Sequence, residues 1–216
     1  MRRTVAPYDR KAAAYDAIVG RPVYHRVFWG TSTQSFGRFG RAALEAAGDG
    51  PFAEVGCGSL LFTAPMYREV RARSVALVDR SMGMLRRGRR RLGSAERPLP
   101  AGITMLHADG AALPLRRGIF PAILSLNLLH VPCDRSAIVA ECARSLLPGR
   151  GRLFVTSLVR SGRWSDGWLS MLHRAGELAA PLTVDQLRET VAGRWALIES
   201  VSLEGNMCFL VVRHGG

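Results

Sequence analysis

The segment EVGCGSL, residues 54–60, decides the fold class of this chain. It places Gly56 and Gly58 directly after a short apolar run, with the acid Glu54 just in front of them. Glycine costs backbone entropy, so a pair of glycines at a bend indicates that something approaches the main chain closely there. The pattern is typical of the first strand-to-helix turn of an α/β sheet, where a ligand binds over the bend.

Predicted strands and helices alternate on the C-terminal side of this turn. Residues 134–147 read as a helix that Asp134 can cap and that Pro148-Gly149 closes. Short connections and right-handed crossovers then predict a parallel sheet with helices on both faces. The predicted parallel strands are residues 51–55, 74–79, 103–108, 119–129 and 152–159.

The end of the chain breaks this alternation. Residues 195–203 and 207–213 read as two strands joined by a tight turn, which predicts an antiparallel hairpin at the sheet edge. Residues 8–47 read as helical and end at Gly48, a good helix stop. We therefore expect an N-terminal helical cap, 1–48, and a main domain, 49–216, with a helical substrate insert at 161–192.

Composition narrows the class of protein. The chain has 216 residues, enough for one domain with a full core, and 48% of them are hydrophobic, which is ordinary for a globular protein. No apolar run reaches membrane-spanning length, and the start lacks the apolar segment of a secretory signal, so the expected location is the cytoplasm. The cysteines form no CxxC pair, so we expect no metal site.

The net charge of +13 is compatible with a nucleic-acid partner. Lys11 is the only lysine, however, so the excess is nearly all arginine, as a codon-biased genome would produce. The densest cluster is RRGRRR, residues 86–91, and Met82, Leu85 and Leu92 lie at helical spacing around it. This pattern favours the solvated face of an amphipathic helix over a binding patch.

Two classes of ligand suit the glycine turn. A dinucleotide would place its pyrophosphate there and would need a third glycine, where this chain has Leu61. The acid that such a site expects about 20 residues further on is present as Asp79, so the spacing alone does not separate the classes.

S-adenosylmethionine is the second ligand class, and it suits the acids at the strand ends. Glu54, beside the turn, can hold the cationic amino group of this ligand. Asp79 can accept hydrogen bonds from both ribose hydroxyls, and Asp109 can accept one from the adenine amino group. All three acids follow or end predicted strands, so they should meet at the rim where open α/β sheets bind ligands.

Over residues 8–160 the sequence resembles the class I S-adenosylmethionine-dependent methyltransferases. The likeness is greatest to the small-molecule branch that includes the ubiquinone and menaquinone C-methyltransferases. Five motifs in the family's order carry the resemblance: YDRKAAAYD (8–16), EVGCGSL (54–60), VDRSMGML (78–85), HADGAALPL (107–115) and LLHVPCDRSAIVAECARSLLPGRGRLFVT (128–156). The chain departs from the family at Leu60, where a third glycine is frequent, and at Phe120-Pro121, where the family has Phe-Asp.

The resemblance implies a Rossmann-like, seven-stranded sheet, mostly parallel with an antiparallel C-terminal hairpin. It also implies an enzyme that moves a methyl group from S-adenosylmethionine to a small molecule. The resemblance places Tyr15 near the cofactor. We add Arg80 and Met82, which follow Asp79 and can line the adenine pocket. The predicted cofactor-binding residues are Tyr15, Glu54, Gly56, Gly58, Asp79, Arg80, Met82, Ala108, Asp109 and Asn127.

His130 follows the fourth predicted strand and is the candidate catalytic residue. Its ordinary pKa suits a base that removes a proton from an acceptor hydroxyl, and a structural role is the alternative. The segment NLLH, 127–130, replaces the signature that accompanies amino-group methylation of bases, and no acids end the fourth and fifth strands as a metal-dependent site would need. These features predict an oxygen or carbon acceptor on a small, apolar or aromatic molecule.

Three alternatives stay open from the sequence. The first is an RNA methyltransferase that uses the arginine-rich surface. The second is a protein that binds the cofactor without transferring a methyl group, or that uses the pocket for another reaction. The third is a dehydrogenase.

Overall fold

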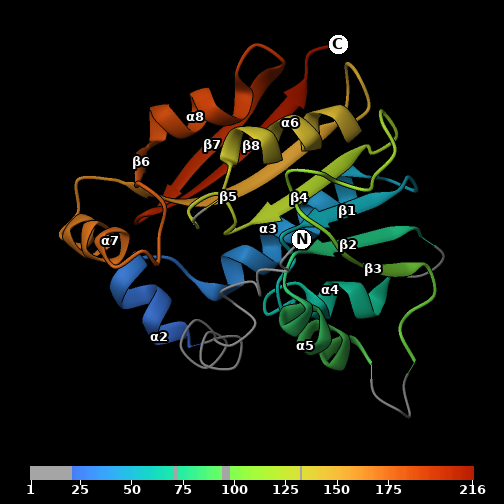
Figure 1. The fold of residues 1–216 in the computed structure, drawn as a ribbon, viewed down its shortest axis with the longest axis horizontal. Coiled ribbons are helices and arrows are strands. Elements are labelled where there is room, and N and C mark those ends of the chain that lie inside the picture. The colour runs from blue at the N-terminus through green and yellow to red at the C-terminus, as the bar shows by residue number, and fades with distance from the viewer. Residues whose placement is uncertain (1–20, 71–72, 94–97, 132) are drawn as a thin grey trace, which may run out of the picture.

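The computed structural model describes residues 21–70, 73–93, 98–131 and 133–216. Its sheet runs in the order β3-β2-β1-β4-β5-β8-β7, and the two-residue strand β6 (Leu182–Thr183) pairs with β5 beside this path (Figure 1). The other strands are β1 (Phe52–Val55), β2 (Val75–Asp79), β3 (Ile103–His107), β4 (Ala122–Leu126), β5 (Arg152–Arg160), β7 (Ala196–Glu204) and β8 (Met207–His214).

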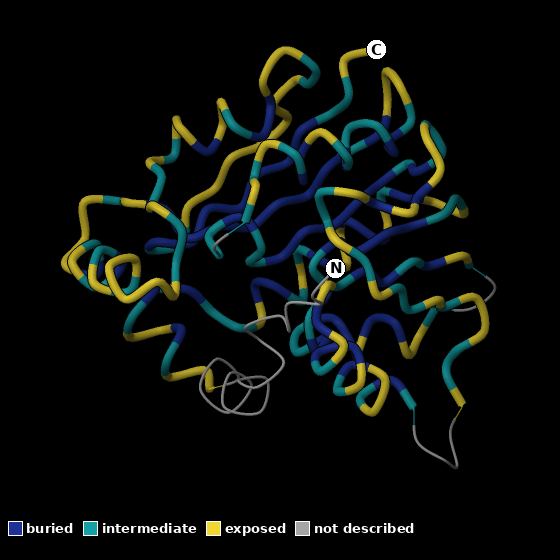
Figure 2. Tube along the Cα trace, viewed as in Figure 1, coloured by how far each residue is buried: buried dark blue, intermediate teal, exposed yellow. Residues whose placement is uncertain are grey.

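Pairing in the sheet confirms the predicted architecture. Strands β3, β2, β1, β4 and β5 are parallel neighbours, whereas β8 is antiparallel to both β5 and β7. All residues of β1 and β4 are buried, because helices cover both faces of the central strands (Figure 2). The C-terminal hairpin forms one end of the sheet, with β7 as its edge strand and most of that strand exposed.

Helices form a layer on each face of the sheet. One buried cluster joins α3 (Thr33–Ala46), α4 (Ala64–Glu69) and α5 (Met82–Leu92) to one face, and a second joins α6 (Arg135–Ser145) and α8 (Val184–Ala192) to the other. The remaining helices are α2 (Pro22–Tyr24), the π-helix η1 (His25–Trp29) and α7 (Ser165–Arg174). None of the helices in the described ranges is long and apolar enough to cross a membrane.

Three element boundaries differ from the sequence-based expectation. The part of the predicted helix 8–47 up to residue 20 lies outside the described residues. The part from residue 21 on is interrupted at Gly30, whose φ is +66°. Strand β4 is shorter than predicted because Asn127 leaves the extended conformation with a φ of +56°. Helix α8, expected in the substrate insert, packs Leu187 and Val191 into the core and so belongs to the covering layer of the sheet.

Candidate functional site

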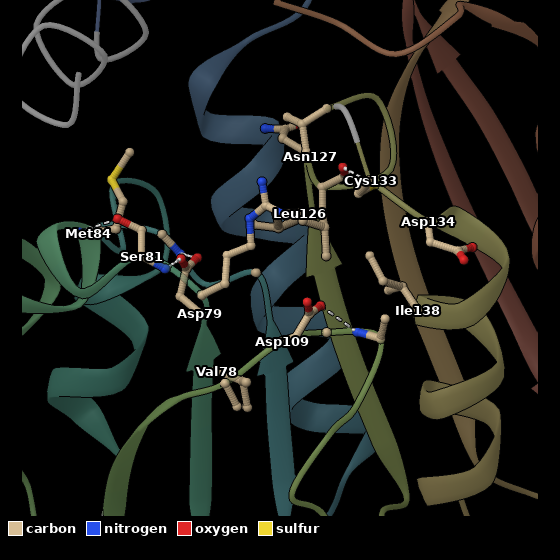
Figure 3. A pocket seen from close by; sticks show the side chains of 18 residues that line it. Val78, Asp79, Ser81, Met84, Asp109, Leu126, Asn127, Cys133, Asp134 and Ile138 are labelled. Atoms are coloured by element: carbon tan, nitrogen blue, oxygen red, sulfur yellow. Dashed lines mark hydrogen bonds between the residues drawn. The ribbon is translucent and has the colours of Figure 1, made fainter. Parts of the chain in front are cut away.

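A cavity of about 170 Å³, here the large cavity, opens at the carboxyl ends of β1 to β4 (Figure 3). Asp79 and Ser81 line one side of it, and Asp134 and Ile138 line the other. Parallel strands end at the same rim, and the chain order reverses between β1 and β4, so this is the position where an open α/β sheet leaves a crevice for a ligand.

The two glycines of the first turn have different tasks. The backbone N–H groups of Gly56 and Cys57 donate to the Val78 carbonyl at 2.8 and 3.0 Å, which holds the turn against β2. A Cβ on Gly56 would lie 2.8 Å from the Leu128 side chain, so packing excludes a larger residue there. A Cβ on Gly58, whose φ is +54°, would meet no atom within 4 Å. Gly58 therefore leaves room at the cavity, where it is a lining residue.

Asp79 ties the turn to the second strand. Its Oδ2 accepts the Gly58 N–H at 2.8 Å, and its Oδ1 accepts the Ser81 N–H at 2.7 Å. These bonds fix the carboxylate at the cavity wall. A carboxylate can accept several hydrogen bonds, so this residue type at the cavity wall suits a ligand that carries hydroxyl groups.

Asp109 and Asn127 face the same cavity from the ends of β3 and β4. Asp109 Oδ1 accepts the Ala111 N–H at 2.9 Å, and its Oδ2 has no partner among the described residues. The Thr156 hydroxyl donates to Asn127 Oδ1 at 3.0 Å, which orients the amide and leaves its Nδ2 without a partner in the described ranges. The site therefore offers an acceptor on one strand end and donors on another.

A second, smaller cavity of about 60 Å³ adjoins the first and shares Gly56, Gly58, Leu126 and Asn127 with it. Glu54 lines this small cavity and is only 2% exposed. Its Oε2 accepts the Tyr67 hydroxyl at 2.7 Å and its Oε1 accepts the Thr63 hydroxyl at 3.4 Å. Burial raises the pKa of Glu54 to about 7, and these two hydrogen bonds oppose the rise.

His130 does not have the geometry expected of a general base. The backbone N–H of Leu158 donates to its Nδ1 at 3.0 Å, so the lone pair of that nitrogen is occupied and the neutral ring carries its proton on Nε2. Burial, together with the charges of Arg135 and His25, lowers the pKa of His130 to about 3. His130 also lines neither cavity, so its ring is placed as a hydrogen-bond donor, and a catalytic role for it stays a prediction.

The remaining predicted residues have three different positions. Arg80 and Ala108 line the large cavity, as expected. Met82 does not line it and is exposed, because Ser81 caps α5 through the Met84 N–H and the inward face of the helix begins at Met84. Met84 lines the cavity and is the methionine that the sequence motif should have indicated. Tyr15 lies outside the described residues.

Leu60, at the family's third glycine position, does not obstruct the site. It has a left-handed backbone with a φ of +58°, it is fully buried, and it lines neither cavity. Gly88 of α5 makes the space, since a Cβ added there would lie 3.1 Å from Leu60 Cγ. A missing side chain on the helix therefore compensates for the extra one in the loop.

Two segments, here the cap segments, meet at one end of the molecule: residues 22–31, with α2 and η1, and residues 161–182, with α7 (Figure 1). The Phe28 ring lies 5.4 Å from that of Trp168 and 6.3 Å from that of Trp164. The buried His25 ring lies 5.5 Å from Phe62, which lines the small cavity. Aromatic side chains of the cap thus continue to the edge of the site.

The turn between β7 and β8 anchors both cap segments. The fully buried Asn206 donates its backbone N–H to the Trp29 carbonyl at 2.8 Å. Its Nδ2 donates to the Val159 carbonyl at 2.9 Å and to Asp166 Oδ1 at 2.6 Å, and the Ser165 hydroxyl donates to its Oδ1. One asparagine side chain therefore fixes the start of α7 while its main chain fixes η1.

Two neighbours of Asn206 strengthen this anchor. A Cβ on Gly205 would lie 1.9 Å from the Trp29 carbonyl oxygen, so only glycine allows the contact. The Thr31 hydroxyl donates to Glu204 Oε2 at 2.9 Å. The sequence predicted only a turn at 204–206, because its partners lie far away along the chain.

The arginine cluster of α5 lies apart from the site. None of residues 86–91 lines either cavity. Among the described residues, no group of three or more histidine, cysteine, aspartate or glutamate side chains is placed to hold a metal ion.

Comparison with solved structures identifies the fold. Geranyl diphosphate C-methyltransferase from Streptomyces coelicolor A3(2) aligns over the full length of both chains, with 13% identity and a TM-score of 0.69. A chain of the complex between the Haloferax volcanii Trm112 methyltransferase activator and the putative methyltransferase aligns over 97% of this chain and 98% of that one, with 14% identity and a TM-score of 0.70. The [4+2]-cyclase SpnF covers 96% and 94%, with 17% identity and a TM-score of 0.68.

A family model described as a methyltransferase domain matches residues 52–149, the part of the chain from β1 to the end of α6. The comparison with curated proteins found no match. The matched range contains Glu54, both glycines of the turn, Asp79 and Asp109. Residues 52–149 thus match a methyltransferase domain, and the chain as a whole has the fold of the class I, S-adenosylmethionine-dependent methyltransferases.

Proposed function

We propose that this protein is an S-adenosylmethionine-dependent methyltransferase that methylates an oxygen or carbon of a small, apolar or aromatic molecule. The observation that carries the proposal is the arrangement of three acids along two joined cavities. Asp109 and Asp79 lie in the large cavity, and Glu54 lies in the small one. This order matches the adenine, the ribose and the amino group along the length of the cofactor.

The residues present fit this cofactor. Asp79 places a carboxylate at the cavity wall where the ribose hydroxyls would lie, Asp109 Oδ2 is available for the adenine amino group, and Gly58 leaves the main chain bare at the junction of the cavities. The geranyl diphosphate C-methyltransferase structure contains S-adenosyl-L-homocysteine, which supports a cofactor of this class. The bound cofactor would supply a methyl carbon already activated by a sulfonium.

The chain's own contribution to the reaction is positioning. Two of the four residues shared by both cavities, Leu126 and Asn127, lie where the methyl group would be presented. The aromatic cap segments, residues 22–31 and 161–182, exclude water and orient an apolar acceptor, and α8 is left out of them because it belongs to the sheet layer. The Nδ1 of His130 is occupied by the Leu158 N–H, which favours an acceptor that is itself acidic or nucleophilic and needs no base.

Calorimetry tests the cofactor assignment. S-adenosylmethionine and S-adenosylhomocysteine should bind, NAD should not, and Asp79→Ala should weaken binding by roughly 100-fold, since it removes two charge-assisted hydrogen bonds. Asp79→Asn, which retains one acceptor oxygen for the turn, should give an intermediate loss. Asp185→Ala is the matched control, because Asp185 is an exposed acid of α8 paired with Arg188. Tight NAD binding without any response to S-adenosylmethionine would overturn the proposal.

Methyl transfer itself needs a separate experiment. The protein is incubated with methyl-labelled cofactor and a cell extract, and the extract is divided into small molecules, RNA and protein. Label in a small molecule supports the proposal. Label in RNA, lost at high salt, would favour the arginine surface and an RNA substrate. Cofactor binding with no transfer would favour a different reaction in the same pocket, as the structural likeness to the cyclase SpnF makes worth testing.

A further inference from the structure

The carboxylate of Glu54 has no positive partner among the residues that the structure describes. The groups that shift its pKa among the described residues are Tyr67, Thr63 and Asp79, and none of them is a cation. This is unexpected in a chain with 30 lysines and arginines. Burying an unpaired carboxylate is unfavourable, so a site that keeps one is built to receive a positive charge from outside.

The described titratable groups that face Glu54 are an acid, a thiol and a phenol, and none of them is a cation. Asp79, at the end of β2, adds a like charge. The thiol of Cys57, in the glycine turn, is buried, and its own pKa is raised. The phenol of Tyr67, on α4, is also buried with a raised pKa, so it remains a donor at neutral pH. Among the described residues, the ionised form of Glu54 is therefore stabilised by hydroxyl donors alone.

Tyr67 is the stronger of these donors. Its hydroxyl lies 2.7 Å from Glu54 Oε2, whereas that of Thr63 lies 3.4 Å from Oε1. The Tyr67 ring is fully buried against Phe52, which fixes the direction of the hydroxyl. Helix α4 thus holds the acid of β1 at the wall of the small cavity, where Glu54 and Thr63 are lining residues.

We propose that Tyr67 is a positioning residue of the cofactor site: it holds the Glu54 carboxylate ready for a ligand ammonium group, so that the affinity for amino-bearing ligands depends on pH. The proposal rests on the proposed cofactor. An ammonium ion favours ionised Glu54, whereas the free site favours the protonated acid. Binding therefore releases a proton at weakly acidic pH, and the affinity rises as the pH is raised.

Two ligands distinguish the pH-dependent contact between Glu54 and the ammonium group from a general change in the shape of the pocket. S-adenosylhomocysteine carries the amino group, and 5′-methylthioadenosine shares its adenosine part but lacks the amino acid. Between pH 5.5 and 7, where the ammonium stays charged, the affinity of the wild type for S-adenosylhomocysteine should rise about tenfold, because each pKa unit of coupling corresponds to a tenfold change. The affinity for 5′-methylthioadenosine should stay constant over this range.

Three variants complete the experiment, which is run by calorimetry on the full chain. Tyr67→Phe should weaken S-adenosylhomocysteine binding about tenfold, the value of one hydrogen bond to a charged group. It should also move the rise in affinity to higher pH and leave 5′-methylthioadenosine unaffected. Glu54→Gln should abolish the pH dependence. Thr190→Val, which removes a hydroxyl of α8 outside both cavities and the cap segments, is the control and should resemble the wild type.

The outcomes separate this inference from the proposed function. If the wild type binds neither adenosyl ligand, the proposed function fails. If it binds both with the same pH profile, or if Tyr67→Phe weakens both equally, only the role of Tyr67 and Glu54 is overturned. Should Tyr67→Phe fail to fold, Thr63→Val, which removes the weaker donor, must shift the profile in the same direction by a smaller amount.

Discussion

The cofactor side and the cap side of the site differ in how far along the chain their contacts reach. On the cofactor side, Asp79 binds the N–H of Gly58, 21 residues away, and that of Ser81, two residues away. On the cap side, Asn206 reaches Asp166 across 40 residues, and Thr31 reaches Glu204 across 173. The first set is built from adjacent strand ends, whereas the second requires the whole sheet to be in place.

This difference implies that the two sides respond differently to mutation. Residues of the cofactor side line the cavities, so their loss should reduce binding more than folding. The anchor of the cap side, centred on the buried Asn206, makes its hydrogen bonds within the protein, so its loss should reduce stability and leave the cofactor affinity unchanged. Variants with large, medium and small expected effects test this separation.

Asn206→Ala should have the largest effect on stability. It removes three side-chain hydrogen bonds, to Ser165, Asp166 and Val159, from a fully buried position, which we expect to lower the free energy of unfolding by about 3 kcal/mol. Urea unfolding measures the loss, and calorimetry with S-adenosylhomocysteine should show unchanged affinity. Ser202→Ala, on the exposed strand β7, is the control. A large loss of affinity at full stability would remove the distinction between the two sides.

Gly58→Ala should have an intermediate effect, and Gly162→Ala is its matched partner. Both glycines have a left-handed backbone, with φ of +54° and +78°, and both face open space, so each alanine should cost about 1 kcal/mol of stability. Only the methyl group at position 58 enters the cofactor cavity. Gly58→Ala should therefore weaken S-adenosylhomocysteine binding at least about tenfold, equivalent to about 1.4 kcal/mol, whereas Gly162→Ala should not. Equal affinities would show that the bare turn at Gly58 is not used by the ligand.

His130→Asn should have the smallest effect on stability at pH 7. It tests the place where the cofactor side and the cap side meet. The Leu158 N–H donates to the His130 ring, and the backbone carbonyl of His130 accepts the Ala179 N–H of the cap at 2.9 Å. Its folded pKa of about 3 lies below the ordinary value of 6.5, so its contribution to stability is complete above pH 6.5 and is lost as the pH falls.

The measurement is urea unfolding of wild type and variant between pH 7 and pH 5. Below pH 6.5 the wild type should lose about 1 kcal/mol more than His130→Asn for each pH unit. The protonation of Glu54 acts in the opposite direction in both proteins, because its folded pKa is raised, and it cancels in the difference. His173→Asn, an exposed histidine of α7, should follow the wild type. Parallel curves for His130→Asn would show that its ring is not held in the neutral form.

The cofactor side could be predicted from the sequence because its signals are local. A glycine turn after a strand and an acid at the end of the next strand lie within one strand–helix–strand unit, and parallel pairing brings them together without further information. The local sequence signals did not settle which side chains of the next helix face the cavity. Met82 and Met84 follow the helix cap Ser81 by one and three residues, and only the capping bond to the Met84 N–H decides which of them faces the cavity.

The cap side could not be predicted because its partners are remote and its residues have no motif. Asn206 read as a turn residue, and nothing near it in the sequence indicates that it receives Ser165 and holds Asp166. The same applies to Tyr67, whose hydroxyl reaches Glu54 only because α4 folds back over β1. The occupied lone pair of His130 depends on the register of β4 and β5, which the pattern of apolar residues does not reveal.

The pairing of Leu60 with Gly88 bears on the order in which substitutions were acquired. A leucine at position 60 fits only if position 88 has no side chain, so the change on α5 had to precede the change in the loop or accompany it. Relatives with glycine at position 60 should therefore accept alanine or larger residues at position 88, whereas those with a bulky residue at 60 should be restricted to glycine. The two positions should thus vary together in a family tree, although neither contacts the ligand.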